Sequence, residues 1–233
     1  MRAVAEVKED DVTDSDNEAE PPGFNSALPA DLAHVPFPFK RFNDEEMLRR
    51  SREYYELMNG RRTLRMFSTG PSGAHTEPWT FVVVKDPEVK QKVREIIEEE
   101  EEINYNKRMG PQWTTDLRPL RTNWIKEYLT EAPYLILLFK QLYSLKPDGS
   151  KKIHYYNEQS VSIAAGLLIS AVHASGLASL TSTPLNCGPA LRTLFGRPSS
   201  EKLTLLLPVG FPSKDATVPD LKRKPLDEIM VVF

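Results

Sequence analysis

The segment RRTLRMFSTGPSGAHTEPW, residues 61–79, combines two features that suit an anion-binding site. Its first part carries Arg61, Arg62 and Arg65, and its second part is a Gly/Pro/Ser turn around Ser72. Arginine side chains and exposed backbone N–H groups both bind phosphate. The segment therefore predicts a site for a phosphate-bearing ligand. On residue types alone, a solvated basic turn after a helix is the more frequent explanation of such a cluster.

A second candidate lies in the glutamate run 98–102, which falls within a predicted helix. A run of like charge is usually a solvated helix face. Glu101 and Tyr105, however, are four residues apart and therefore share one face of the helix. A carboxylate beside a phenol, with a lysine from a neighbouring helix, could bind the ammonium and carboxylate groups of an amino acid. The residues alone do not choose that lysine, and they do not require one.

Several other chemistries find little support. The turn around Ser72 does not match G-x-S-x-G, and the chain has neither a GxGxxG motif nor a phosphate-binding P-loop. Four scattered histidines and one cysteine, Cys187, lack the spacing of metal ligands, so no metal is expected. Cys187 is better explained as a small buried hydrophobe than as a redox group. A net charge of −3 argues against a nucleic-acid-binding surface over the whole fold.

Strand-like and helix-like segments interleave along the chain without a regular parallel βαβ pattern. This order favours an α+β domain with a mostly antiparallel sheet flanked by helices. The apolar stretch 163–180 contains His173 and serines, so we interpret it as a buried helix leading into a strand and not as a membrane span. The expected strands are residues 80–86, 133–140, 177–183 and 202–212, and the expected helices are 44–58, 87–109, 115–131, 156–175 and 188–196.

The chain divides into a tail and one domain. Residues 1–38 are acidic and poor in large apolar side chains, which predicts a disordered tail, and residues 39–233 form the predicted domain. No signal peptide or apolar anchor is found at the start, so the sequence predicts a soluble, cytoplasmic protein. A single cysteine suits a reducing compartment.

From about Phe39 to the C-terminus, the chain resembles the iodotyrosine deiodinase family of the nitroreductase-like flavoproteins. This resemblance rests on motifs that occur in order: RRTLR, PSGAHTEPWTFVVVKDP, EEEEINYNKRMG, LRTNWIKEYL, HYYNEQSVSIA, TSTPLNCGP and VPDLKRKPLDEIM. It implies an α+β, arm-exchanged homodimer that binds FMN at the subunit interface. It also implies reductive removal of iodide from mono- and diiodotyrosine for iodide salvage. The implied electron source is NADPH, with an NADPH-dependent reductase as the partner that delivers the electrons.

The resemblance assigns roles to particular residues. A hydrogen bond from the Thr183 hydroxyl to flavin N5 would favour one-electron chemistry, which makes Thr183 the expected catalytic residue. The expected substrate contacts are the Ala74 backbone N–H for the phenolate, and Glu101, Tyr105 and Lys126 for the amino-acid zwitterion. Without the resemblance, Lys126 would be interpreted as a surface lysine. The expected FMN contacts are Arg61, Arg62, Thr63, Leu64, Arg65, Ser72, Thr181, Ser182, Thr183 and Arg223.

Two departures from the family keep alternatives open. The family commonly begins with a membrane anchor, so the protein would be membrane-bound if its N-terminus is incomplete. The family also has a turn and a helix between its arginine motif and its Pro-Ser-Gly turn, whereas Arg65 and Ser72 are seven residues apart here. An average helix alone needs about 11 residues. The alternatives are therefore a general FMN nitro- or quinone reductase, or a catalytically impaired variant.

Overall fold

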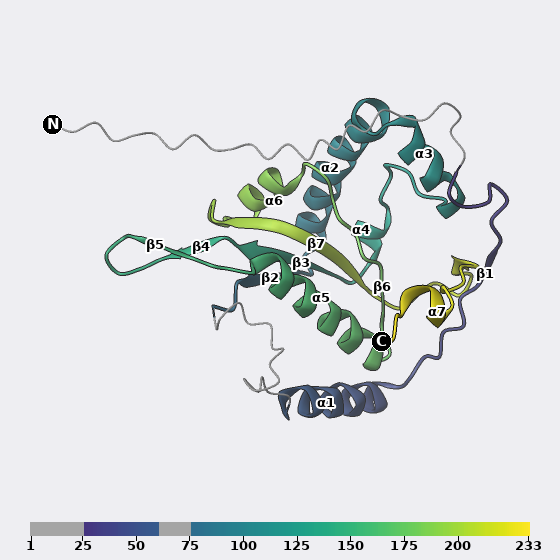
Figure 1. Ribbon diagram of the computed structural model, residues 1–233, viewed down its shortest axis with the longest axis horizontal. Helices are drawn as coiled ribbons and strands as arrows, with labels where there is room; N and C mark the ends of the chain where they lie inside the picture. The colour runs from purple at the N-terminus through teal and green to yellow at the C-terminus, as the bar shows by residue number, and fades with distance from the viewer. Residues whose placement is uncertain (1–25, 61–75) are drawn as a thin grey trace.

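The centre of the fold is a four-stranded antiparallel sheet in the order β2-β3-β7-β6 (Figure 1). The structure is a computed structural model and describes residues 26–60 and 76–233. In the register, Leu137 of β3 faces Val82 of β2 on one side and Leu206 of β7 on the other. The strands are β2 (Trp79–Val84), β3 (Tyr134–Gln141), β6 (Ala178–Ser179) and β7 (Glu201–Gly210).

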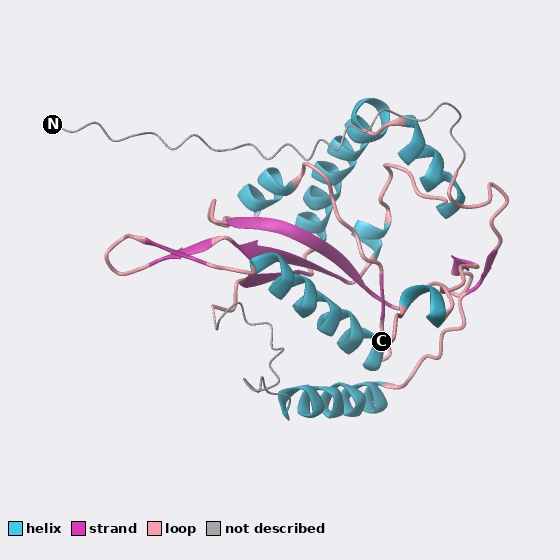
Figure 2. Ribbon diagram, in the orientation of Figure 1, coloured by secondary structure: helices cyan, strands magenta, loops and turns pink. Residues whose placement is uncertain are grey.

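Helices cover both faces of this sheet (Figure 2). One face packs against α5 (Asn157–Ala174), and the other against α2 (Pro87–Ile103), α4 (Tyr128–Glu131) and α6 (Gly188–Leu194). Because side chains alternate along a strand, Leu137 and Leu138 enter different cores. The double coverage explains why β3 and β7 are almost continuously apolar.

Most of the predicted elements that lead into this core are confirmed. The strands expected at 80–86 and 133–140 correspond to β2 and β3, and the helix expected at 156–175 is α5. At the start of α1 (Asp44–Gly60), the Glu46 N–H donates to Asn43 Oδ1 at 2.8 Å, which caps the helix. The strand expected at 177–183 is shorter, because only β6 and a backbone bridge at Ser182 join the sheet.

The helix expected at 115–131 is wrong. The chain instead forms α3 (Pro111–Leu117), a 3₁₀ turn, η2 (Arg118–Leu120), and then a stretch that is irregular until α4. Pro119 lacks an N–H donor, and Arg121 adopts a left-handed φ of 54°, which ends helical geometry. The Ile125 N–H donates to Asn123 Oδ1 at 2.9 Å, a local bond that competes with a helix.

The two ends of the described chain contribute more structure than the sequence predicts. Strand β1 (His34–Pro36) pairs with β8 (Thr217–Pro219), so ordered structure begins before the predicted boundary at residue 38. The C-terminal segment also contains one helical turn, α7 (Leu226–Ile229), for which no helix is among the expected elements. Strands β4 (Tyr143–Leu145) and β5 (Lys151–Ile153) form a projecting hairpin (Figure 1).

Within residues 26–60 and 76–233, none of the helices combines the length and the apolar character that crossing a membrane would require.

Candidate functional site

Helix α2 brings one of the predicted substrate residues into the protein interior. Asp86 caps the helix by accepting hydrogen bonds from two backbone N–H groups, and Pro87 occupies its first turn. Val93 and Ile97 face the core, and Glu101 follows at the same four-residue spacing. Glu101 is therefore buried, although the glutamate run around it suggests a solvated face.

The end of α2 continues into a π-helical turn, η1 (Asn104–Arg108), which carries the half-buried Tyr105. Its ring meets Trp124 edge-on, with the ring centroids 5.9 Å apart. Short π-helical turns occur often at functional sites because they reorient side chains relative to the preceding helix. Here the turn places Tyr105 over the irregular stretch that precedes α4.

Lys126 comes from that irregular stretch and completes a cluster with the other two predicted substrate residues. Its Nζ lies 3.9 Å from Glu101 Oε2 and 5.7 Å from the centroid of the Tyr105 ring. The ammonium group also donates to the backbone carbonyl of Asn123. The structure thus brings together Glu101, Tyr105 and Lys126, which we call the clamp.

A further glutamate fixes the position of Lys126. The Lys126 backbone N–H donates to Glu98 Oε1 at 2.6 Å, and Arg94 Nε donates to the same oxygen at 2.8 Å. Arg94 also donates to Thr130 Oγ1 of α4 at 3.1 Å. Glu98 was missed from the sequence, although its four-residue spacing from Arg94 predicts an ion pair on α2.

Burial and charge shift the proton affinities in the clamp. Burial lowers the pKa of Lys126, and the carboxylates of Glu101 and Glu98 partly oppose this effect. Burial raises the pKa of the Tyr105 phenol, a hydrogen bond with Thr122 lowers it, and the charge of Glu101 raises it again, for a net increase. The phenol therefore stays protonated at neutral pH and can donate a hydrogen bond.

The segment with the predicted cofactor residues lies beside the clamp. Ser182 exchanges backbone hydrogen bonds of 3.0 and 2.9 Å with Leu206 of β7, which leaves Thr181 and Thr183 exposed on either side of it. In an extended chain, alternate side chains share one side, so the two threonine hydroxyls face the same way. The Leu185 N–H points to Glu101 Oε1 at 3.5 Å, which joins this segment to the clamp.

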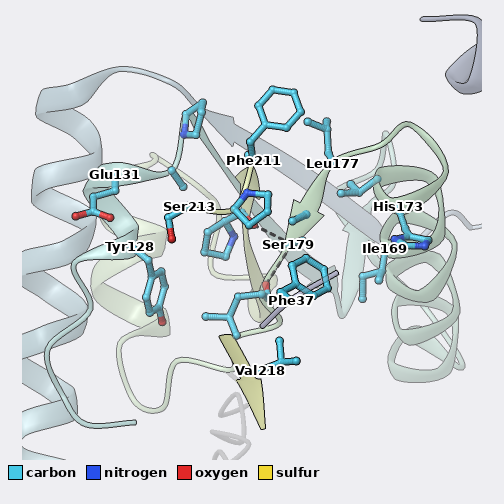
Figure 3. A pocket seen from close by; sticks show the side chains of 18 residues that line it. Phe37, Tyr128, Glu131, Ile169, His173, Leu177, Ser179, Phe211, Ser213 and Val218 are labelled. Carbon is cyan, nitrogen blue, oxygen red and sulfur yellow. Dashed lines mark hydrogen bonds between the residues drawn. The ribbon is translucent and has the colours of Figure 1, made fainter. Parts of the chain in front are cut away.

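Tyr128 of α4 connects the same two regions from the other side. Burial raises the pKa of its phenol, a hydrogen bond with the Ser182 side chain lowers it, and the nearby charge of Glu101 raises it, for a net increase. Tyr128 also lines a cavity of about 730 Å³ beside β6, shown in Figure 3. The cavity extends to His173 at the end of α5 and to Phe211 after β7, and most of its lining is apolar.

The remaining predicted residues are not gathered at the clamp. Arg223 is exposed on the segment between β8 and α7 and, among the contacts of the described residues, has no hydrogen bond to the clamp. Seven predicted site residues, and with them the shortened segment, lie outside the described residues: Arg61, Arg62, Thr63, Leu64, Arg65, Ser72 and Ala74. The part of the chain that the structure describes contains no cluster of metal-ligating side chains.

Comparison with known proteins defines the class. Residues 55–211 match the model of the nitroreductase family, so the chain belongs to that family. A BluB-like flavoprotein from Clostridium difficile shares the fold, with a TM-score of 0.54 at 16% identity over 85% of this chain and 93% of that one.

Within this class, several relatives are iodotyrosine deiodinases. The chain is 61% identical to iodotyrosine deiodinase 1 of Homo sapiens over 217 residues, covering 86% of this chain and 75% of the human protein. It is 57% identical to the iodotyrosine deiodinase of Hydra vulgaris, covering 85% and 79% of the two chains. A solved iodotyrosine deiodinase bound to FMN and 3-iodo-L-tyrosine superposes with a TM-score of 0.59 at 27% identity, over 84% and 90% of the two chains.

The human comparison also bears on the length of the chain. The match extends over 217 aligned positions but includes only 86% of the 233 residues of this chain, which is about 200 (0.86 × 233). The difference means that this chain has gaps within the matched region. Gaps of this kind agree with a shortened segment.

Proposed function

We propose that this protein uses FMN to remove iodide reductively from mono- and diiodotyrosine, releasing iodide and tyrosine for iodide salvage. The observation that carries the proposal is the convergence of Glu101, Tyr105 and Lys126 beside the segment 181–183. A carboxylate and an ammonium group held side by side match the two charges of an amino acid. The iodotyrosine deiodinase relatives add the identity of the substrate.

The described residues fit an FMN site on one side. The exposed hydroxyls of Thr181 and Thr183 offer neutral hydrogen-bond donors at the edge of the sheet, next to the clamp. Thr183 would donate to N5 of the flavin ring, and Ser182 supports it through Leu206. Arg61, Arg62, Arg65 and Ser72 would hold the phosphate and the ring edge, with Arg223 as a contact from the C-terminal segment. When bound, FMN supplies the reducing electrons.

The clamp binds and orients the substrate. Glu101 accepts hydrogen bonds from the substrate ammonium, Lys126 binds its carboxylate, and Tyr105 covers the site as a protonated hydrogen-bond donor. The Ala74 backbone N–H would meet the phenolate, where a backbone donor stabilises negative charge. Closing these groups over the ring excludes water and strengthens each charged contact.

In the net reaction, the aryl carbon–iodine bond breaks, and two electrons and one proton convert iodotyrosine into tyrosine and iodide. We assign NADPH as the ultimate source of the electrons, delivered by a reductase partner.

We further propose that two copies form an arm-exchanged homodimer. Strand β6 is at the edge of the sheet, and the mostly apolar cavity opens beside it. The C-terminal residues Val231, Val232 and Phe233 are highly exposed. Contiguous exposed apolar surface marks an interaction site. The C-terminal arm of a second copy supplies matching apolar side chains for the cavity.

The decisive experiment is a titration of the purified, FMN-reconstituted protein with diiodotyrosine, followed by flavin fluorescence. We expect saturable quenching that Lys126→Ala abolishes. The matched control is Lys90→Ala, which removes a different buried lysine, located on α2. The Lys90 ammonium donates to the carbonyls of Thr130 and Ala132, and in the described part of the chain no hydrogen bond or ion pair joins it to the clamp.

Each alternative predicts a different result. Turnover of flat aromatics that lack an amino-acid group, unaffected by Lys126→Ala, would indicate a general nitro- or quinone reductase. A protein that does not retain FMN would indicate that the shortened segment between Arg65 and Ser72 has impaired the cofactor site.

A further inference from the structure

Asn104 is a buried polar residue that the proposed reaction does not yet use. It lies at the junction of α2 and η1 and is only 1% exposed. Its Nδ2 donates to the Leu185 carbonyl at 3.3 Å, and its Oδ1 accepts from Asn186 Nδ2 at 2.9 Å and Arg108 Nη1 at 3.1 Å. Asparagine is a poor helix former, and burying an amide is costly without partners. The position is therefore explained by what the side chain binds.

The segment that Asn104 binds is the one that carries Thr183. Leu185 and Asn186 follow Thr183 by two and three residues. Asn186 has a left-handed φ of 64°, which asparagine tolerates better than most residues. Upstream, Ser182 is fixed by its two backbone bonds to Leu206. Thr183 therefore lies between two segments that hydrogen bonds hold in place. Ser182 is held by Leu206 before it, and Leu185 and Asn186 are held by Asn104 after it.

The peptide groups of Leu185 also connect this anchor with the clamp. The Leu185 N–H approaches Glu101 Oε1 at 3.5 Å, while its carbonyl accepts from Asn104 at 3.3 Å. The bond to Glu101 is long, and a substrate ammonium group on the same carboxylate would compete with it. The bond to Asn104 involves no group of the clamp, so we expect it to remain when substrate occupies Glu101.

We propose that Asn104 is a positioning residue, which holds the Leu185 peptide, and through it the Thr183 hydroxyl, in place while substrate occupies Glu101. This inference rests on the proposed function. Asn104 acts through Thr183 and does not touch the substrate, so its removal should affect the chemical step and the flavin potentials more than substrate affinity.

The test compares Asn104→Leu, which has a similar volume but forms no hydrogen bonds, with Asn104→Asp. The aspartate keeps the acceptor for Asn186 and Arg108, replaces the donor to Leu185 by a second acceptor oxygen, and adds a negative charge beside Arg108. Both are measured as FMN-loaded proteins, with and without iodotyrosine. The readouts are kcat, KM and the separation of the two one-electron midpoint potentials of the bound flavin.

We expect kcat to fall about tenfold or more in both variants, as for other groups that orient a reactive residue, with KM within about twofold. We also expect the potential separation to lose its response to substrate. The control Arg197→Met removes two hydrogen bonds from the buried Glu201. Glu201 lies five residues along β7 from Leu206, roughly 17 Å away, so this control should leave the potentials unchanged.

The outcomes separate the inference from the function on which it rests. If the unmodified protein deiodinates iodotyrosine and both Asn104 variants keep its potentials and kcat, the inference is overturned and the proposed function stands. If the unmodified protein neither quenches nor deiodinates, both are overturned. Should Asn104→Leu fail to fold, Asn104→Asp decides, because it keeps two of the three hydrogen bonds.

Discussion

The ammonium group of Lys126 lies 3.9 Å from a carboxylate oxygen of Glu101, and each side chain is only 10% exposed. A direct charge-assisted hydrogen bond would be about 2.7–2.9 Å long, so this pair is loose. The looseness suits a clamp, because each charge is compensated before substrate arrives and still has capacity for a new partner. An entering amino-acid zwitterion exchanges one loose ion pair for two closer ones.

The first prediction concerns the pH dependence of binding. Burial lowers the pKa of Lys126, so its ammonium group loses its proton at a lower pH than an ordinary lysine. The Kd for diiodotyrosine should therefore rise at alkaline pH, with a midpoint below the usual lysine pKa, in a fluorescence titration. Lys126→Arg is the control, since arginine stays charged throughout. An identical alkaline limb in both proteins would assign the titration to the substrate or to another group.

The lowered pKa of Lys126 affects stability and substrate binding in opposite directions as pH rises. The unfavourable effect of burying the charged lysine is fully present below the folded-state pKa. Between that pKa and the higher unfolded-state value, the unfolded chain binds more protons. The contribution of Lys126 to the free energy of unfolding should therefore increase with pH in this window, while substrate affinity falls. Urea unfolding of the Lys126→Met variant alongside the unmodified protein isolates this contribution.

The second prediction concerns Glu98, which accepts the Lys126 backbone N–H at 2.6 Å. Glu98→Ala should free the stretch that carries Lys126 and raise the Kd for diiodotyrosine. A hydrogen bond to a charged group contributes about 1.5 kcal/mol or more, which corresponds to about tenfold in Kd. FMN retention should not change. Glu98→Gln keeps an acceptor and should lose much less affinity, and the exposed neighbour Glu99→Ala should lose none. Equal losses in Glu98→Ala and Glu99→Ala would refute a specific role.

The sequence predicts the interior of this fold well, since its signals are local. The apolar runs of β3 and β7 and the long helix α5 follow from hydrophobic pattern, and Asp86-Pro87 marks the start of α2. The failure at 115–131 has an equally local cause, because Pro119 and the left-handed Arg121 interrupt a plausible amphipathic pattern. Pairing of β1 with β8 was missed because it joins residues far apart in sequence.

Local sequence signals predicted the candidate site only in part. Four-residue spacing placed Glu101 and Tyr105 on one face, but nothing local selected Lys126, which approaches from a separate non-helical stretch. The resemblance supplied that residue. Asn104 and Glu98 escaped both routes, because their roles depend on backbone groups of Leu185 and Lys126 that only the folded chain brings near.

The third prediction tests the proposed homodimer. Leu167 and Ile163 of α5 are exposed and lie four residues apart on one helix face. We assign this exposed apolar face to the contact between copies, in addition to the cavity beside β6. Leu167→Glu should therefore place a charge in the contact and give a monomer that loses FMN while the monomer fold remains. Multi-angle light scattering and flavin absorbance measure the two effects. Gln91→Glu on the exposed face of α2 is the control. A Leu167→Glu protein that remains dimeric and yellow would exclude this face from the contact.

The last prediction concerns the buried carboxylate of Glu201, at the start of β7. Arg197 donates two hydrogen bonds to it, at 2.8 and 2.7 Å, and the Thr80 hydroxyl donates a third at 2.7 Å. Burial raises the pKa of Glu201, but these hydrogen bonds and the charge of Arg197 together lower it by more, so the pKa lies below its ordinary value. The resulting stability is present above the unfolded-state pKa and is lost as pH falls through the folded-state pKa.

Removing either partner should therefore have unequal effects at neutral pH. Arg197→Met leaves a buried carboxylate without its cation and should cost about 3 kcal/mol of unfolding free energy. Glu201→Gln should cost less, since the Arg197 side chain is one-third exposed and can be hydrated. Urea unfolding at pH 7 measures the difference, and in acid the two variants should converge, because protonated Glu201 no longer needs its cation. A larger loss for Glu201→Gln than for Arg197→Met at pH 7 would show that the arginine, and not the carboxylate, is the group that depends on the pair.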